Sequence, residues 1–267
     1  MTDSLGDRMK AYEEQETHAR FLPNVPIVAR IDGRCFSSFT KGMVRPFDPT
    51  FSEIMRKVTS RLVAETGACI GYTQSDEISL CWYNDNPGAD IFFGGRKFKM
   101  TAQLAALATA YLHIEGRKTI YDHRFERAPT FDARVFQVPT LEEGANSFLW
   151  RQRDCRKNAV SMVARAFYSH KELLNKHRDD MLGMLAARGI DFDDYPWQST
   201  EGTFVRKEVV ERPLSGAELI LIPEDKRPNG MVKRSRIQEL RIPLLSELEN
   251  ATDVIFRGKQ PAQRVRV

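Results

Sequence analysis

The sequence has few of the residues that build disulfide frameworks or zinc sites. Its 267 residues include only four cysteines and five histidines. The cysteines show no Cys-x-x-Cys spacing, and the histidines show no His-Glu-x-x-His or zinc-finger spacing. Because disulfide-rich domains need closely spaced cysteines and zinc sites need such ligand pairs, both classes are disfavoured.

Long apolar runs, internal repeats and low-complexity tracts are also missing from the sequence. A membrane-spanning helix needs about 20 consecutive apolar residues, so we expect no membrane partner. The first residues are polar and lead into charged sequence, unlike the apolar segment of a signal peptide. We therefore expect a cytoplasmic protein.

The composition is that of a soluble globular protein. Hydrophobic residues make up 42% and charged residues 28% of the chain. This length is enough to bury a sizeable core, in one large domain or two small ones. The net charge of +4 is a mild positive excess. It is compatible with a polyanionic partner, but many proteins without such a partner are equally basic.

Two acidic segments follow apolar runs, where strands are expected to end. Residues 26–31 are short, rich in β-branched side chains and bounded by proline and glycine, which predicts a buried strand that ends at Asp32. Residues 68–82 predict a hairpin whose turn carries Asp76. Between them, residues 51–62 have apolar side chains at helical spacing. Strand, helix and hairpin would then bring Asp32 and Asp76 to one edge of a sheet.

Two carboxylates at one sheet edge are the ligands that a pair of Mg²⁺ ions needs. Mg²⁺ takes oxygen ligands and is usually held by one or two carboxylates together with substrate phosphates. Two such ions form a phosphoryl-transfer site. The alternative is that Asp32 and Asp76 only form turns, which is a common role of aspartate.

The rest of the chain predicts an α+β fold. Apolar residues at helical spacing over 100–111 predict a second helix that starts near Arg96, and residues 131–138 predict a fourth strand, which gives the order β-α-β-β-α-β. We expect an antiparallel sheet with both helices on one face. Further helices are expected over 141–169 and from 169 to a stop at Gly189, followed by a short strand at 202–206.

Three segments resemble, in the same order, motifs of the tRNA-His guanylyltransferase family, and most closely its bacterial guanylyltransferase-like branch. They are Arg-Ile-Asp-Gly-Arg at 30–34, Gly-Tyr-Thr-Gln-Ser-Asp-Glu at 71–77 and Trp-Arg-Gln-Arg-Asp-Cys at 150–155. The resemblance extends from about residue 21 to about residue 206. It implies a polymerase-palm-like fold and an enzyme that adds nucleotides to the 5′ end of tRNA, in the 3′–5′ direction.

The resemblance also implies roles for individual residues. Asp32, Asp76 and Glu77 would be catalytic, and Asp32, Gly33 and Asp76 would hold two Mg²⁺ ions. GTP and ATP would be substrates. Nucleotide-binding roles are implied for Arg30, Gly33, Arg34, Lys41, Arg45, Ser75, Arg96, Lys99, Asp154 and Asn158. The family further suggests a homo-oligomer, a tetramer.

Arg96 and Lys99 also suggest an anion site by themselves. They lie three residues apart at the expected start of the second helix, where cations oppose the helix dipole. A bound triphosphate would compensate both charges and accept hydrogen bonds from the free amides. The alternative is a basic patch on the surface.

The sequence divides into a palm-like catalytic domain at 1–140, a helical region at 141–210 that completes it, and a basic C-terminal extension at 211–267. Two other functions remain open, a palm-fold nucleotide cyclase and a non-catalytic RNA-binding protein. Residues 156–162 read Arg-Lys-Asn-Ala-Val-Ser-Met, where the tRNA-His enzymes have His-Ile-Asn-Asn-Leu-Tyr-Asn. This departure predicts templated 5′ repair of truncated tRNAs over untemplated addition of G to tRNA-His.

Overall fold

A six-stranded sheet forms the centre of the computed structural model, which describes residues 4–86, 88–228 and 230–264. The strand order is β4-β1-β3-β2-β5-β6, and each of these neighbouring pairs is antiparallel. The strands are β1 (Ile27–Gly33), β2 (Ile70–Gln74), β3 (Glu77–Trp82), β4 (Phe131–Gln137), β5 (Thr203–Pro213) and β6 (Met231–Leu240). The predicted α+β class with an antiparallel sheet is therefore confirmed.

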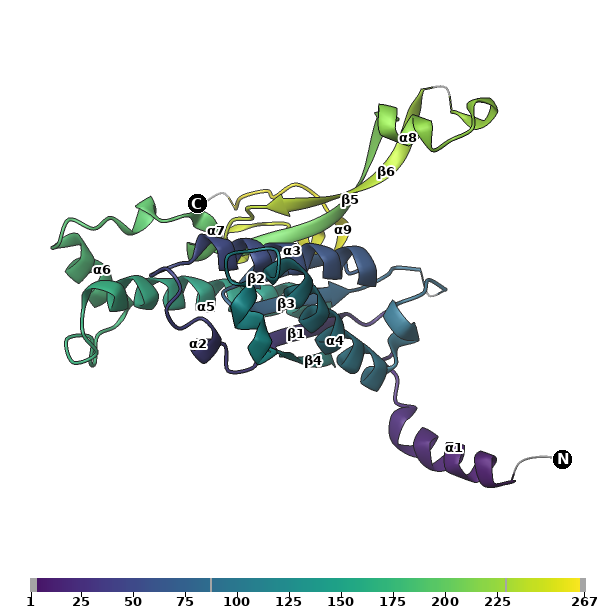
Figure 1. Ribbon diagram of the computed structural model, residues 1–267, viewed down its shortest axis with the longest axis horizontal. Helices are drawn as coiled ribbons and strands as arrows, with labels where there is room; N and C mark the ends of the chain where they lie inside the picture. Colours follow the sequence, from purple (N-terminus) through teal and green to yellow (C-terminus); the bar gives the residue numbers. More distant parts are fainter. Residues whose placement is uncertain (1–3, 87, 229, 265–267) are drawn as a thin grey trace.

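Two long helices cover one face of the sheet, as predicted (Figure 1). They are α3 (Pro49–Thr66) and α4 (Lys97–Gly116). Helix α3 begins at Asp48, whose carboxylate accepts a hydrogen bond from the Phe51 amide at 2.8 Å, and it ends at Gly67 with φ of 66°. Apolar residues on alternate positions of β1 pack against these helices in the larger of two cores.

The opposite face of the sheet is covered over its middle by α5 (Leu141–Phe167) and α9 (Ala251–Arg257). Phe148 of α5 packs against Phe204 of β5, which in turn packs against Tyr72 of β2. Edge strand β4 is different, because its alternate residues Asp132, Arg134 and Phe136 are exposed. This face therefore has a covered part under α5 and an open part along β4.

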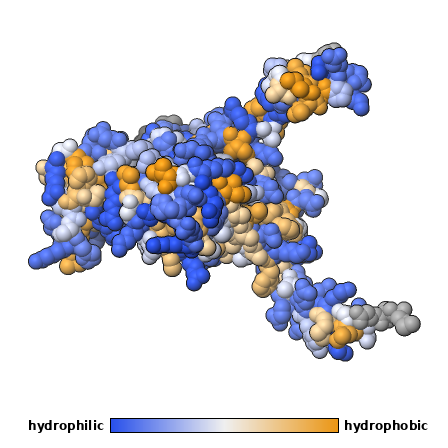
Figure 2. All heavy atoms as spheres, in the orientation of Figure 1, coloured by the Kyte–Doolittle hydropathy of each residue, from blue (hydrophilic) through white to orange (hydrophobic). Residues whose placement is uncertain are grey.

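The strand expected at 202–206 is longer than predicted. It continues to Pro213 and pairs along ten residues with β6, which the sequence did not predict. The two strands form a hairpin that projects from the body of the molecule and carries α8 (Gly216–Ile220) at its tip (Figure 1). Ile220 and Leu221 are 81% and 83% exposed there, within the apolar patch that Figure 2 shows at this tip.

The predicted C-terminal extension thus includes one strand of this hairpin, and it also contributes to the second core. Ile242, Leu245, Leu248, Val254 and Ile255 are buried in the cluster that includes Phe148. Residues 1–3 and 265–267, at the ends of the predicted domains, lie outside the described residues, as do Pro87 and Asn229.

The helix expected from residue 169 begins later than predicted. Ser169 and Glu172 do form a cap, with Ser169 Oγ 2.7 Å from a Glu172 carboxylate oxygen. Asn175 then adopts a left-handed backbone with φ of 60°, which interrupts the turn. The helix, α6, therefore spans only Arg178–Ala186.

The remaining helices are shorter or peripheral. They are α1 (Ser4–Thr17), α2 (Phe36–Phe39), α7 (Trp197–Thr200) and the 3₁₀ turns at Phe92–Gly95, Asp122–Arg127, Phe192–Asp194, Glu224–Lys226 and Leu245–Glu247. Helix α1 projects from the body and has no buried residue. No helix in the described part of the chain combines the length and the apolar character that a membrane crossing requires.

Candidate active site

The three predicted catalytic carboxylates lie at one edge of the sheet. Asp32 is directly opposite Glu77 in the pairing of β1 with β3. The Gly33 amide donates a hydrogen bond of 3.1 Å to the carbonyl of Asp76. Ser75, in the hairpin turn, has a left-handed φ of 48° and donates from Oγ to Asp76 Oδ1 at 3.1 Å. The end of β1 and the β2–β3 turn are thereby tied together.

Asp32 and Asp76 have no basic side chain paired with them in the described part of the chain. Burial raises the pKa of Asp76, and repulsion by Asp32 adds to the shift, while hydrogen bonds from the Asp76 backbone and Ser75 oppose it. A cation is the group that would relieve this repulsion.

The donor set at this edge fits Mg²⁺. Within residues 4–86, 88–228 and 230–264 there is no cluster of three or more Asp, Glu, His or Cys that could hold a metal by itself. Mg²⁺ does not need such a cage, since it is commonly bound by one or two carboxylates, water and substrate phosphates. Two uncompensated carboxylates beside the Gly33 backbone match that arrangement.

Glu77 is held by arginine rather than free. Arg151 of α5 donates from Nε to Glu77 Oε1 at 2.6 Å and from Nη2 to Asp154 Oδ2 at 2.8 Å. Asn158 Nδ2 donates to the same Asp154 oxygen at 3.1 Å, and Arg30 Nε lies 3.9 Å from Glu77. Burial raises the pKa of Glu77, and Arg151 opposes that shift. Glu77 therefore connects the hairpin to α5.

The role of Arg151 was not predicted, although it lies in the Trp-Arg-Gln block. Its side chain is only 10% exposed, which is rare for arginine unless it is paired. The available signal was its spacing from Asp154, three residues later on the same helix face.

The loop between β1 and α3 carries three exposed cations, Arg34, Lys41 and Arg45. It leaves β1 directly after Gly33, so it lies at the carboxylate edge. Arg124 holds the loop by donating from Nη1 to the carbonyls of Phe39 and Lys41, both at 2.9 Å. The structure thus places the start of this loop, with Arg34 directly after Gly33, at the carboxylate edge.

Asp48 closes the same loop. Its Oδ2 accepts a hydrogen bond from the Val44 amide at 3.0 Å and another from the Tyr121 hydroxyl. Because Asp48 also caps α3, one buried carboxylate fixes both the loop and the helix that follows it.

Arg96 and Lys99 lie at the other end of the sheet. Helix α4 begins beside Phe92, whose ring stacks on Trp82 at the far end of β3. Trp82 is paired with Ile27, which lies five residues before Asp32 on β1, a distance of about 17 Å along the strand. Within one chain, the structure does not bring Arg96 and Lys99 together with the carboxylates.

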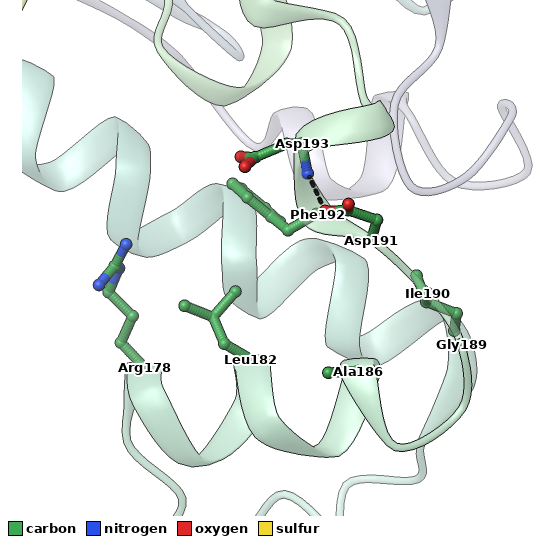
Figure 3. Close-up of a pocket in the computed structure, with 8 residues that line it drawn as sticks. All are labelled: Arg178, Leu182, Ala186, Gly189, Ile190, Asp191, Phe192 and Asp193. Atoms are coloured by element: carbon green, nitrogen blue, oxygen red, sulfur yellow. Dashed lines mark hydrogen bonds between the residues drawn. The ribbon is translucent and has the colours of Figure 1, made fainter.

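Two surface hollows lie away from the carboxylates. One, of about 680 Å³, is lined by Arg96 with Arg20, Glu65, Asp90 and Lys207. The other, of about 630 Å³, lies between α6 and residues 189–193 and includes the apolar side chains of Leu182 and Phe192 (Figure 3). The second hollow contains none of the predicted site residues.

Comparison with known proteins is consistent with this fold and these motifs. A family described as tRNAHis guanylyltransferase (Thg1) matches residues 6–139. A bacterial Thg1-like protein in complex with ATP is 35% identical over 77% of this chain and 89% of its own, with a TM-score of 0.72. A bacterial Thg1-like protein in complex with GTP is 31% identical over 91% of this chain and 94% of its own, with a TM-score of 0.70.

Sequence relatives agree. A probable tRNA(His) guanylyltransferase of Dictyostelium discoideum is 25% identical, covering 79% of this chain and 85% of that protein. A probable tRNA(His) guanylyltransferase of Drosophila melanogaster is 26% identical, covering 84% and 81%. The chain belongs to the Thg1 family of tRNAHis guanylyltransferases.

Proposed function

We propose that this protein is a Mg²⁺-dependent nucleotidyltransferase that adds nucleotides to the 5′ end of tRNA, in the 3′–5′ direction. The observation that carries the proposal is the pair of carboxylates, Asp32 and Asp76, at one sheet edge with no cation of the described chain against them. Membership of the Thg1 family supports the choice of tRNA as substrate.

In this proposal, Asp32, the Gly33 carbonyl and Asp76 hold two Mg²⁺ ions. When bound, the ions would polarise the phosphoryl group and stabilise charge on the attacking and leaving oxygens. The chain itself places the two carboxylates, through the hydrogen bond from Gly33 to Asp76 and the link from Glu77 to Arg151. No covalent protein nucleophile is required, because positioning and electrostatics lower most of such a barrier.

The basic loop is the proposed triphosphate site. Arg34, Lys41 and Arg45 are exposed at the carboxylate edge, where they can neutralise the phosphates of GTP or ATP. Complexes of bacterial Thg1-like proteins with ATP and with GTP support both nucleotides as ligands. Arg30, Ser75, Asp154 and Asn158 stay proposed nucleotide-binding residues, although each makes a contact within the protein that the ligand would have to share or replace.

Arg96 and Lys99 remain proposed triphosphate ligands. The nucleotide that they bind would lie too far from Asp32 and Asp76 of the same chain to contact them. Either a second nucleotide binds there or a neighbouring copy brings its carboxylates to it. The second arrangement agrees with the proposed homo-oligomer. Mixing Arg96→Ala subunits with Asp76→Asn subunits tests it, because shared sites would regain activity in the mixture, whereas separate sites would not.

The preferred reaction is proposed to be templated repair of truncated tRNAs. In residues 156–162, where this sequence differs from the tRNA-His enzymes, Arg156 is 3.7 Å from Glu201 and Lys157 is exposed. Such charges hold phosphate but carry little base information. Base pairing with the opposite strand would then select the nucleotide. A cytoplasmic location is proposed together with this action on tRNA.

The test uses tRNA transcripts that lack the first 5′ nucleotide, with Mg²⁺ and all four nucleoside triphosphates. Changing the opposite nucleotide from C to A should change the added nucleotide from G to U. Full-length tRNA-His under matched conditions should be the weaker substrate. Addition of G regardless of template, or a preference for full-length tRNA-His, would refute templated repair. Cyclisation of GTP in the absence of RNA would favour the cyclase alternative.

A further inference from the structure

One exposed side of α5 carries an aromatic ring followed by two cations. Trp150, Arg153 and Lys157 are spaced i, i+3 and i+7, so they share one side of the helix. All three are exposed, and Trp150 is 53% exposed. We name these three residues the α5 stripe.

The charges of the α5 stripe are available to a ligand. Within the described residues, neither Arg153 nor Lys157 forms an ion pair or a side-chain hydrogen bond. Their neighbours on other sides of the helix differ, since Arg151 is bound by Glu77 and Arg156 lies 3.7 Å from Glu201. Structural arginines of this helix are thus paired inward, while the stripe faces outward.

The stripe lies next to the catalytic edge. The guanidinium of Arg30 lies 5.4 Å from the centre of the Trp150 ring. Arg30 precedes Asp32 by two residues on β1, or about 7 Å along the strand. Beyond Arg30, the sheet face is open along β4, where Arg134 and Phe136 are exposed. A strand of nucleic acid that ends at Asp32 and Asp76 can therefore reach Trp150.

We propose that the α5 stripe binds the RNA strand beside the 5′ end that is extended. Trp150 stacks on a nucleobase, and Arg153 and Lys157 contact phosphates of the neighbouring nucleotides. From Trp150 to Lys157 the helix rises by about 10 Å, which corresponds to about three nucleotides at 3.4 Å each. An aromatic ring followed by cations is the common pattern of sites for single-stranded nucleic acid. This inference rests on the proposed action on tRNA.

Stacking on Trp150 is tested by fluorescence titration of the full chain without divalent ions, so that no turnover occurs. Trp82 is buried and Trp197 is half-buried, so a stacked base should quench chiefly the exposed Trp150, and Trp150→Phe shows how much of any quenching comes from the other two tryptophans. A 5′-truncated tRNA should quench the emission of the wild type and not that of Trp150→Phe. GTP and ATP are titrated separately to learn whether a free nucleotide supplies the base. Absence of quenching by all three would overturn the stacking.

Binding strength gives a second readout. Trp150→Leu should weaken tRNA binding about 5- to 150-fold, as loss of one stacked base does. Trp150→Phe, which keeps a ring for stacking, should bind much nearer to the wild type. If Trp150 only covers Arg30 and Arg151, the two variants would bind tRNA equally and as tightly as the wild type, which contradicts the proposal.

The cations are tested by the salt dependence of tRNA binding. Arg153→Gln and Lys157→Gln should each reduce the slope of log K against log salt concentration by about 0.7. Lys57→Gln, which removes an exposed cation from α3 on the other face of the sheet, is the matched control and should leave the slope unchanged. Equal slopes in all variants would refute the phosphate contacts. If the wild type extends tRNA and these variants bind tRNA normally, the proposed role of the α5 stripe is refuted and the proposed function is kept. If the wild type neither binds nor extends tRNA, the proposed function is refuted.

Discussion

Arg151→Met tests whether the link between the hairpin and α5 holds the catalytic edge in place. The substitution removes the guanidinium that bonds Glu77 at 2.6 Å and Asp154 at 2.8 Å, while the apolar part of the side chain is largely kept. It leaves the Glu77 carboxylate buried, and Arg30, at 3.9 Å, is then its one ion-pair partner within the part of the chain that the structure describes.

The burial of the Glu77–Arg151 pair determines how much unfolding free energy Arg151→Met should cost. Both side chains are 10% exposed, so the value for surface ion pairs, about 0–1 kcal/mol, does not apply. Removing one partner of a buried pair costs about 3–5 kcal/mol, because the other charge is left uncompensated. Since Arg30 remains, we expect a loss near the lower end, about 3 kcal/mol.

The assay is the free energy of unfolding from urea denaturation of Arg151→Met, Glu77→Gln and the double variant. In the double variant no buried charge is left without its partner, so the two losses should not add. The difference should be about 1–3 kcal/mol in favour of the double variant. Arg165→Met removes an exposed arginine of the same helix and should change the stability by less than about 0.5 kcal/mol.

A loss in Arg151→Met no larger than that of Arg165→Met would refute the reasoning. Strictly additive losses in the double variant would also refute it, because they would mean that Glu77 and Arg151 stabilise the fold independently.

The other predictions concern nucleotide binding and packing. Arg45→Ala should raise the KM for GTP more than it lowers kcat, because the ground-state triphosphate makes the same contact as the transition state; an unchanged KM would mean that Arg45 is only a solvated loop residue. Gly116→Ala should lower stability by about 1–3 kcal/mol through overpacking, which exceeds the helix-propensity gain of about 1 kcal/mol, since its Cβ would lie 1.8 Å from the Phe125 ring. Gly183→Ala, with no atom within 4 Å of the added Cβ, is the control and should unfold at equal or higher urea concentration; a similar loss in both would contradict the packing argument.

Strands with apolar patterns were predictable, and those without were not. β1 and β3 are buried over nearly their whole length, so β-branched and apolar residues mark them in the sequence. β6 has no buried residue; its side chains are mostly polar, and only its pairing with β5 defines it. The projecting hairpin was therefore missed, and the apolar stretch at its tip could not be assigned to a strand or a core.

The positions of the candidate site residues were predictable where they follow the end of an apolar strand, and not where they depend on the direction in which the chain leaves the sheet. Asp32 and Asp76 follow apolar runs, so their common edge could be inferred. The distance of Arg96 from them follows from β3 running away from the hairpin turn, so that α4 starts at the far end. The strand directions are enough to infer this separation. The charges of Arg96 and Lys99, from which a triphosphate site was predicted, do not indicate it. Arg151 has two partners, Glu77 at a separation of 74 residues and Asp154 at a separation of three residues. The contact with Asp154 could be inferred from helical spacing, whereas the contact with Glu77 could be found only in the structure.

The most direct test of the central claim compares the wild type with Asp76→Asn in single-turnover extension of a 5′-truncated tRNA, with tRNA binding measured in parallel. Loss of one electrostatic stabiliser of the transition state lowers the rate about 10²–10³-fold, and we expect at least that for Asp76→Asn. Because Asp76 lies at the edge of the sheet and, among the described residues, only Ser75 donates a side-chain hydrogen bond to it, tRNA binding and folding should be retained. Extension by Asp76→Asn at the wild-type rate, or no extension by the wild type, would contradict the proposed function.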